Sequence, residues 1–127
     1  MEHFELILIY LANILVAGWV GLTSLFAPAV AVRSVWQGTT SADGASLRVV
    51  GALWTSIALL SLFGLFNPLG FAPVLLLQLI YKGGWLLAVA LPARLKDSQH
   101  PLPMGMSLFF AVWVFILPMI MPWSSLF

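Results

Sequence analysis

Long apolar stretches without formal charge dominate this chain. No Asp, Glu, Lys or Arg lies between Glu5 and Arg33 or between Arg48 and Lys82, and none follows Asp97. A transmembrane helix needs about 20 predominantly apolar residues to cross roughly 30 Å of hydrocarbon. Each of the three stretches is long enough for at least one such helix, so the pattern predicts a protein that crosses a membrane several times.

Turn-forming residues divide the stretches into separate helices. The second stretch is interrupted by Asn67–Pro73 (NPLGFAP), and the last helix follows the proline-containing run at 100–103 (HPLP). Proline and glycine at these positions favour a turn followed by a new helix. We expect spans at about 6–31, 48–66, 72–91 and 104–123, the third ending before Pro92. The expected fold class is all-α: a polytopic integral membrane protein with one four-helix transmembrane domain over residues 1–127.

Prolines and small residues within the spans predict local geometry. Pro28 should bend the first helix, because its ring nitrogen cannot donate to Ser24, and Pro118 and Pro122 should kink or fray the end of the last helix. Small residues spaced by four let helices approach closely in lipid, where apolar burial alone does not drive association. Such pairs are Ala17 with Gly21, Gly51 with Thr55, Ala52 with Ser56, and Gly84 with Ala88.

The composition narrows the possible functions. Hydrophobic residues make up 62% of the chain and charged residues 7%, against about 45–50% and 25% in soluble domains. A net charge of +1 provides no basic footprint for nucleic acid. With no cysteine, disulfides, thiolate metal sites and cysteine nucleophiles are excluded. His3 and His100 both fall outside the expected hydrocarbon region, so no metal or haem site is expected within it.

The distribution of basic residues predicts the orientation. All the Lys and Arg residues outside the spans fall on one side of the membrane: Arg33, Arg48, Arg94 and Lys96. The other side carries Glu2 and Glu5 and no basic residue. By the positive-inside rule, loops 33–47 and 92–103 are cytoplasmic, and both termini face the periplasmic side of a bacterial inner membrane.

Lys82 is the most informative single residue. It lies near the middle of the third span, where a lysine costs about 2.5–3.5 kcal/mol and usually faces the bundle interior. Gln78 lies one turn before it and Trp85 one turn after, with Leu75 and Val89 extending the same stripe. The spacing predicts an inward polar and aromatic face.

Comparing depths across the spans suggests partners for this face. Asn13 lies about level with Gln78, which predicts a hydrogen bond between them, and Thr55 or Ser56 lies about level with Lys82. No carboxylate lies within the spans. Three states of Lys82 therefore remain open: a neutral amine, an ammonium bound to an anionic ligand or to an acid of another subunit, and an ammonium whose stem carries it to a wet cavity.

Tryptophans and one arginine complete the candidate site. Trp54, Trp85 and Trp113 lie deeper than headgroup level and near the depth of Lys82. They could form an aromatic pocket beside a cation, or each could pack singly. Arg48 begins the second span, either as a membrane anchor or as an anion contact at the mouth of a cavity.

The segment 47–54 (LRVVGALW) places Arg48 at the start of a helix, followed by Gly51 and an apolar run. This segment and the four-span layout resemble the DoxX-like group of small four-helix membrane proteins. The resemblance implies a membrane subunit or accessory protein, linked in some members to quinone-dependent oxidation. This chain departs from the redox-linked relatives by lacking their cysteines.

Two functions from different classes follow. The first is a non-enzymatic accessory or assembly subunit of a larger membrane complex, meeting other subunits or a second copy through its small-residue pairs and Lys82. The second is a binder or transporter with a Lys82, Gln78 and Trp85 pocket for a lipid, a quinone or an amphiphilic anion. An enzyme ranks third, because one lysine without an acid or histidine is little for acid–base catalysis. No bound cofactor is required by either function.

Overall fold

The computed structural model describes residues 3–36, 45–95 and 103–127, and within these residues all regular structure is helical. This confirms the all-α prediction. The helices are α1 (Phe4–Phe26), α2 (Pro28–Ser34), α3 (Ala45–Gly64), α4 (Pro73–Trp85), the π-helical segment η1 (Leu86–Ala90), α5 (Leu91–Leu95), α6 (Met104–Ile120) and α7 (Trp123–Leu126).

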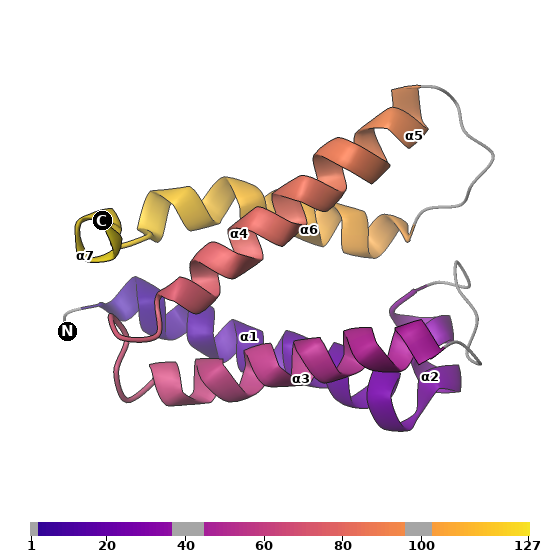
Figure 1. Ribbon diagram of the computed structural model, residues 1–127, viewed down its shortest axis with the longest axis horizontal. Helices are drawn as coiled ribbons and strands as arrows, with labels where there is room; N and C mark the ends of the chain where they lie inside the picture. The colour runs from indigo at the N-terminus through magenta and orange to yellow at the C-terminus, as the bar shows by residue number, and fades with distance from the viewer. Residues whose placement is uncertain (1–2, 37–44, 96–102) are drawn as a thin grey trace.

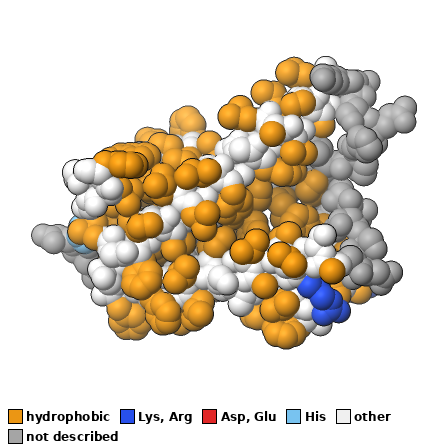
Figure 2. Space-filling model, in the orientation of Figure 1, with side chains coloured by type: hydrophobic (Ala, Val, Ile, Leu, Met, Phe, Trp, Pro, Cys, Tyr) orange, Lys and Arg blue, Asp and Glu red, His pale blue; other side chains and the backbone are white. Residues whose placement is uncertain are grey.

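Three helical stretches are long and apolar enough to cross a membrane: Phe4–Phe26, Ala45–Gly64 and Pro73–Leu95. The last of these runs continuously through α4, η1 and α5. α6 is also apolar but has only 17 residues, about 25 Å at 1.5 Å per residue. Figure 2 shows a surface covered largely by hydrophobic side chains. Such a surface suits contact with lipid.

The helices form two layers. α1 and α3 lie side by side in one layer, and α4 and α6 pack against each other in the other (Figure 1). The start of α1, the turn between α3 and α4, and α7 lie at one end of the molecule, at the left of Figure 1. α2, the start of α3 and α5 lie at the opposite end.

Prolines end some of the helices and lie within others. The bend predicted at Pro28 is confirmed, because α1 stops at Ala27 (φ −135°, ψ 62°) and α2 begins at Pro28. At the C-terminal end, the separate short helix α7 follows Pro122, which confirms the disruption predicted at that residue, whereas α6 continues through Pro118 to Ile120.

The expectation that the third helix ends before Pro92 is wrong. The helix continues to Leu95 because the π-helical turn η1 precedes the proline. A proline ring clashes with the carbonyl four residues earlier, here Ala88, in a regular α-helix. Ala88 lies within η1, where the wider turn changes that spacing and lets the helix continue.

The contact between α1 and α3 depends on glycine. A Cβ atom added to Gly51 would lie 2.6 Å from the Leu25 backbone nitrogen, and one added to Gly21 would lie 2.5 Å from Thr55 Oγ1. Two of the expected small-residue pairs therefore meet each other here. The other two pairs, which include Ala52 and Gly84, are exposed, and a Cβ at Gly84 would meet nothing within 4 Å.

Candidate functional site

The third span turns its polar stripe inward, as the spacing predicts. Leu75, Gln78 and Lys82 are at most 1% exposed. The prediction fails at Val89, which is 44% exposed, because Val89 lies within η1, where the wider turn shifts the α-helical spacing. Ala90, rather than Val89, is buried at the next turn.

Five aromatic rings surround the Lys82 ammonium, and we call them the aromatic box. Each ring centroid lies 5.4–5.6 Å from Nζ, and the rings belong to Trp54, Tyr81, Phe109, Phe110 and Trp113. A desolvated cation–π contact contributes about 2 kcal/mol. Two such contacts would offset the cost of about 2.5–3.5 kcal/mol for a lysine at mid-membrane. The box would thus stabilise the charged form of Lys82 without a carboxylate.

The rings of the box hold one another in place. Trp54 stacks on Phe110 with centroids 5.9 Å apart, and Tyr81 meets both rings edge-on at 6.0–6.1 Å. On α6, Phe109 stacks on Trp113 at 4.8 Å. Because the rings come from α3, α4 and α6, the box joins the two layers of the bundle.

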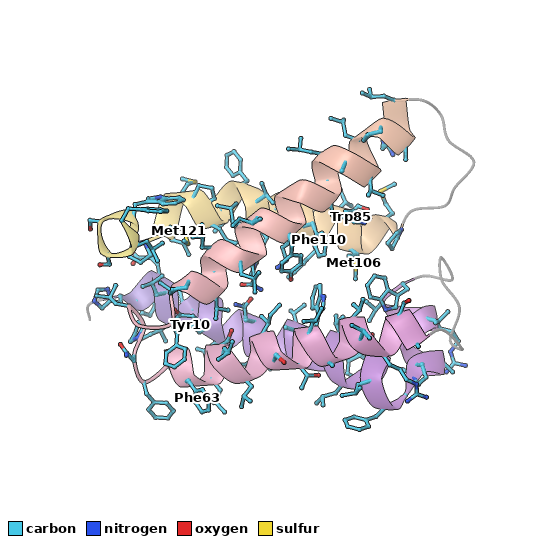
Figure 3. The ribbon with its side chains drawn as sticks, in the orientation of Figure 1. Tyr10, Phe63, Trp85, Met106, Phe110 and Met121 are labelled. Atoms are coloured by element: carbon cyan, nitrogen blue, oxygen red, sulfur yellow. The ribbon has the colours of Figure 1, made fainter. Side chains whose placement is uncertain are left out.

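Three tryptophans were candidates from sequence, and they take different places. Trp54 and Trp113 belong to the box, whereas Trp85 is half-buried and packs edge-on against Phe110 at 5.5 Å. Figure 3 shows Trp85 and Phe110 where α4 crosses α6. Sequence reasoning missed the three phenylalanine and tyrosine members of the box. The two phenylalanines could have been found by counting one helical turn back from Trp113.

A buried amide pair lies one turn away from the box. Asn13 Nδ2 donates to Gln78 Oε1 at 2.8 Å, and Gln78 Nε2 donates to Asn13 Oδ1 at 3.1 Å. The hydrogen bond predicted from depth is therefore confirmed. Asn13 Nδ2 also donates to Ser61 Oγ at 3.2 Å, so the pair ties α4 to both α1 and α3.

The predicted contact of Lys82 with Thr55 or Ser56 is not formed. The Thr55 hydroxyl donates to the Gly51 carbonyl at 2.8 Å, and the Ser56 hydroxyl donates to the Ala52 carbonyl at 2.9 Å. The prediction placed the partner of Lys82 at the correct level of α3 but on the wrong face of that helix. Adjacent residues on a helix point about 100° apart, and Trp54 is the residue that faces Lys82.

Two polar atoms of the box are buried without a hydrogen-bond partner among the described residues: the Tyr81 hydroxyl and the Trp113 indole nitrogen. Gln78 is a neighbour of the Tyr81 hydroxyl, but its amide is engaged with Asn13. Each unpaired buried group costs about 1–3 kcal/mol. In the described part of the chain, the Trp113 indole N–H and the Tyr81 hydroxyl are therefore buried donors without an acceptor, and they belong to rings beside the Lys82 amino group.

Two cavities lie against the box. A cavity of about 360 Å³ between α3 and α4, which we call the lateral cavity, is lined by Trp54, Tyr81, Leu53, Ile57, Leu60 and Leu77, among others. A second cavity of about 170 Å³ is lined by residues of α1, α2, α3 and α6 that include Trp54 and Phe109. Trp54 lines both cavities and Lys82 lines neither, so a ligand in either cavity would reach the Lys82 amino group only when a ring of the box moves aside.

Arg48 lies apart from these features. It is exposed at the start of α3, and its guanidinium donates to the Leu25 carbonyl at 3.0 Å. The helix break at Ala27 and Pro28 leaves carbonyls of the last turn of α1 without their usual helical partners. The described contact of Arg48 is thus structural, and an anion contact there stays a prediction.

A comparison with known proteins finds no protein family, no curated protein and no solved structure that this chain matches. The resemblance to the DoxX-like group therefore stays a prediction. The chemistry of the box must be argued from its own geometry.

Proposed function

We propose that this chain binds an amphiphilic molecule, with a hydrogen-bond-accepting head in the aromatic box and an apolar part in the lateral cavity. The observation that carries the proposal is that the box has buried hydrogen-bond donors without matching acceptors. It holds the Tyr81 hydroxyl and the Trp113 indole N–H without an acceptor in the described part of the chain, and both rings lie beside the Lys82 amino group. A ligand that brings an acceptor would relieve this cost, because an unmade buried hydrogen bond is more unfavourable than an apolar contact.

The surroundings define the class of ligand. Ring faces on several sides favour a flat or compact head group, and the ammonium favours a carbonyl, carboxylate or phosphate oxygen. The lateral cavity is lined almost wholly by apolar side chains, which suits a hydrocarbon or isoprenoid segment. A quinone, a lipid and an amphiphilic anion all share this combination.

The proposed setting is a bacterial inner membrane crossed four times, with both termini on the periplasmic side. α6 and α7 together run from the α2 end of the molecule to the end where α1 begins (Figure 1), which supports a fourth crossing. The basic residues visible in Figure 2 gather at the α2 end, where Arg33 and the start of α3 lie. The predicted loops 33–47 and 92–103, with Lys96, fall partly or wholly outside the described residues, as does Glu2.

Because the chain has no cysteine, single-cysteine labelling can test this orientation. Ser125→Cys and Ser34→Cys lie at opposite ends of the bundle. A membrane-impermeant maleimide added to intact spheroplasts should label Cys at 125 and should reach position 34 only after permeabilisation. Labelling of both positions from outside would contradict four crossings with cytoplasmic Arg33.

A second candidate function is that of a subunit in a larger membrane complex or a homo-oligomer. The specific observation that favours it is Gly84, where a Cβ would meet nothing within the chain. Glycine in a helix costs about 1 kcal/mol relative to alanine, and in lipid it allows another helix to approach. Mass analysis of the particle extracted in mild detergent tests it: Gly84→Leu should reduce a multi-chain particle to the lone chain.

Binding is tested with Lys82→Met, which keeps an unbranched side chain one atom shorter and removes the amino group. Decylubiquinone and oleate, each titrated against the protein in detergent, should quench tryptophan fluorescence saturably in the natural sequence. Lys82→Met should weaken binding of at least one probe about tenfold or more, because a charge-assisted hydrogen bond contributes about 1.5–3 kcal/mol.

Two further variants test whether a loss of binding is specific to the aromatic box. Trp113→Phe removes the unpaired indole N–H and should also weaken binding, whereas Trp19→Phe, at a position 54% exposed on α1, should not. An unfolding temperature maintained in Lys82→Met shows that the bundle persists. Binding of both probes unchanged in Lys82→Met and in Trp113→Phe would refute the proposed site.

A further inference from the structure

A second apolar groove lies farther along the third span than the lateral cavity. It has a volume of about 630 Å³ and runs between the η1–α5 segment and α6. Its walls include Leu87, Leu91 and Leu95 on one side and Met104 and Leu108 on the other, and Arg94 lies along it. None of the rings of the aromatic box lines this groove, so it is a separate feature.

The groove lies where two packed helices separate. α4 packs on α6, and η1 and α5 continue the same helical stretch beyond that contact. Figure 1 shows α5 diverging from the start of α6. The groove therefore occupies the space between two helices that cross and then move apart.

The walls of the groove are open to the bilayer. Leu87 is 70% exposed, Leu95 is 76% exposed and Leu108 is 61% exposed. Large apolar side chains exposed to this extent in a membrane-spanning stretch meet lipid hydrocarbon. The groove is thus shaped to receive an acyl chain along its length.

Arg94 supplies the polar end of the groove. It is exposed and lies one residue before the end of the long apolar stretch Pro73–Leu95, at the depth of lipid headgroups. Within the described residues its guanidinium forms no hydrogen bond or ion pair. The Ser107 hydroxyl, also in the groove, donates to the Pro103 carbonyl at 2.9 Å. The guanidinium is therefore the group left to recognise a headgroup.

We propose that this groove is a binding site for an anionic phospholipid, with the lipid phosphate on Arg94 and an acyl chain along the leucine walls. The planar guanidinium offers paired N–H donors that match phosphate oxygens. The charge of the occupant follows from Arg94, and its hydrocarbon part follows from the walls. A soluble phosphate would leave those walls unused, so the proposal commits to the lipid.

The test uses the full chain, freed of lipid in detergent and titrated with dioleoylphosphatidylglycerol or dioleoylphosphatidylcholine. Native mass spectrometry counts bound lipids and gives each affinity. Phosphatidylglycerol should bind more tightly than phosphatidylcholine. Arg94→Gln should weaken phosphatidylglycerol binding about fivefold, the factor for one basic residue at an anionic membrane surface, and should leave phosphatidylcholine binding unchanged.

Matched variants test whether lipid binding depends on the groove itself, rather than on the net charge of the protein or on the aromatic box. Arg33→Gln removes the same charge from the end of α2, outside the groove, and should leave phosphatidylglycerol affinity unchanged. Leu108→Trp should fill the groove and weaken both lipids. The loss of about fivefold caused by Arg94→Gln should be the same in a Lys82→Met background, which separates this site from the aromatic box. Equal affinity for the two lipids, or an equal loss in Arg33→Gln and Arg94→Gln, would overturn the proposal.

Discussion

Helices pack in opposite ways at two places in this molecule. One is the contact between α1 and α3, and the other is the aromatic box. At the first, Gly21 and Gly51 bring two backbones together so closely that a Cβ atom would not fit. At the second, five aromatic rings from three helices fill the space around one ammonium. The first contact leaves no room for a ligand, whereas the second is flanked by two cavities.

The difference shows that close helix packing and space for a ligand occur in different parts of the bundle. Small residues maximise van der Waals contact between helices, which is a main source of association in lipid. Large rings cannot fill space as completely, and here they leave cavities and two unpaired polar atoms. The α1–α3 contact therefore acts as a scaffold, while the box between the two layers is the part with room for chemistry.

The largest effect should come from breaking the scaffold. Gly51→Leu places a side chain where the α1 backbone lies 2.6 Å from the Cβ position, and it should destabilise the bundle by at least about 3 kcal/mol, at the upper end of overpacking costs. Thermal unfolding in detergent measures this. The matched control is Gly84→Leu, whose Cβ meets nothing within 4 Å and which should leave the unfolding temperature of the lone chain nearly unchanged.

An intermediate effect should come from the amide pair that links the scaffold to α4. Gln78→Leu leaves buried polar atoms of Asn13 without their partner, which should cost about 1–2 kcal/mol. The double variant Asn13→Leu with Gln78→Leu should recover much of that loss, because both polar groups are gone and the Ser61 hydroxyl can turn to its own helix backbone. A double variant no more stable than Gln78→Leu alone would show that the pair does not couple α1 to α4.

The smallest effect should come from the surface of the scaffold. Arg48→Gln removes the 3.0 Å bond from the guanidinium to the Leu25 carbonyl, and a single exposed hydrogen bond contributes about 0.5 kcal/mol. Arg33→Gln, at the end of α2, changes the net charge equally and is the reference for charge alone. The difference in unfolding temperature between the two variants isolates the bond across the helix break. Identical temperatures would show that water replaces the guanidinium at that carbonyl.

Several features of the site follow from single residues and their depth. A lysine in the middle of an apolar helix is so unfavourable toward lipid that its inward orientation is predictable, and the structure places Lys82 at 1% exposure. The Asn13–Gln78 pair is also predictable, because buried amides seek each other at equal depth. The identity of the ring opposite Lys82 is not, since depth says nothing about the rotation of α3. Rotation is decided by the glycine contact with α1, which places Trp54 inward and Ser56 outward.

The amino-acid sequence by itself determined the helical class, the approximate positions of three long apolar helices and the inward position of the one ionisable residue in the middle of the third. These depend on the transfer of each residue from water to hydrocarbon, which is a property of the local chain. Only the tertiary structure decided the π-helical turn before Pro92, the assembly of five rings around Lys82, and the lateral cavity and apolar groove beside the third span. Those depend on how several helices rotate and diverge to satisfy one another's side chains at once, and no single segment carries that information.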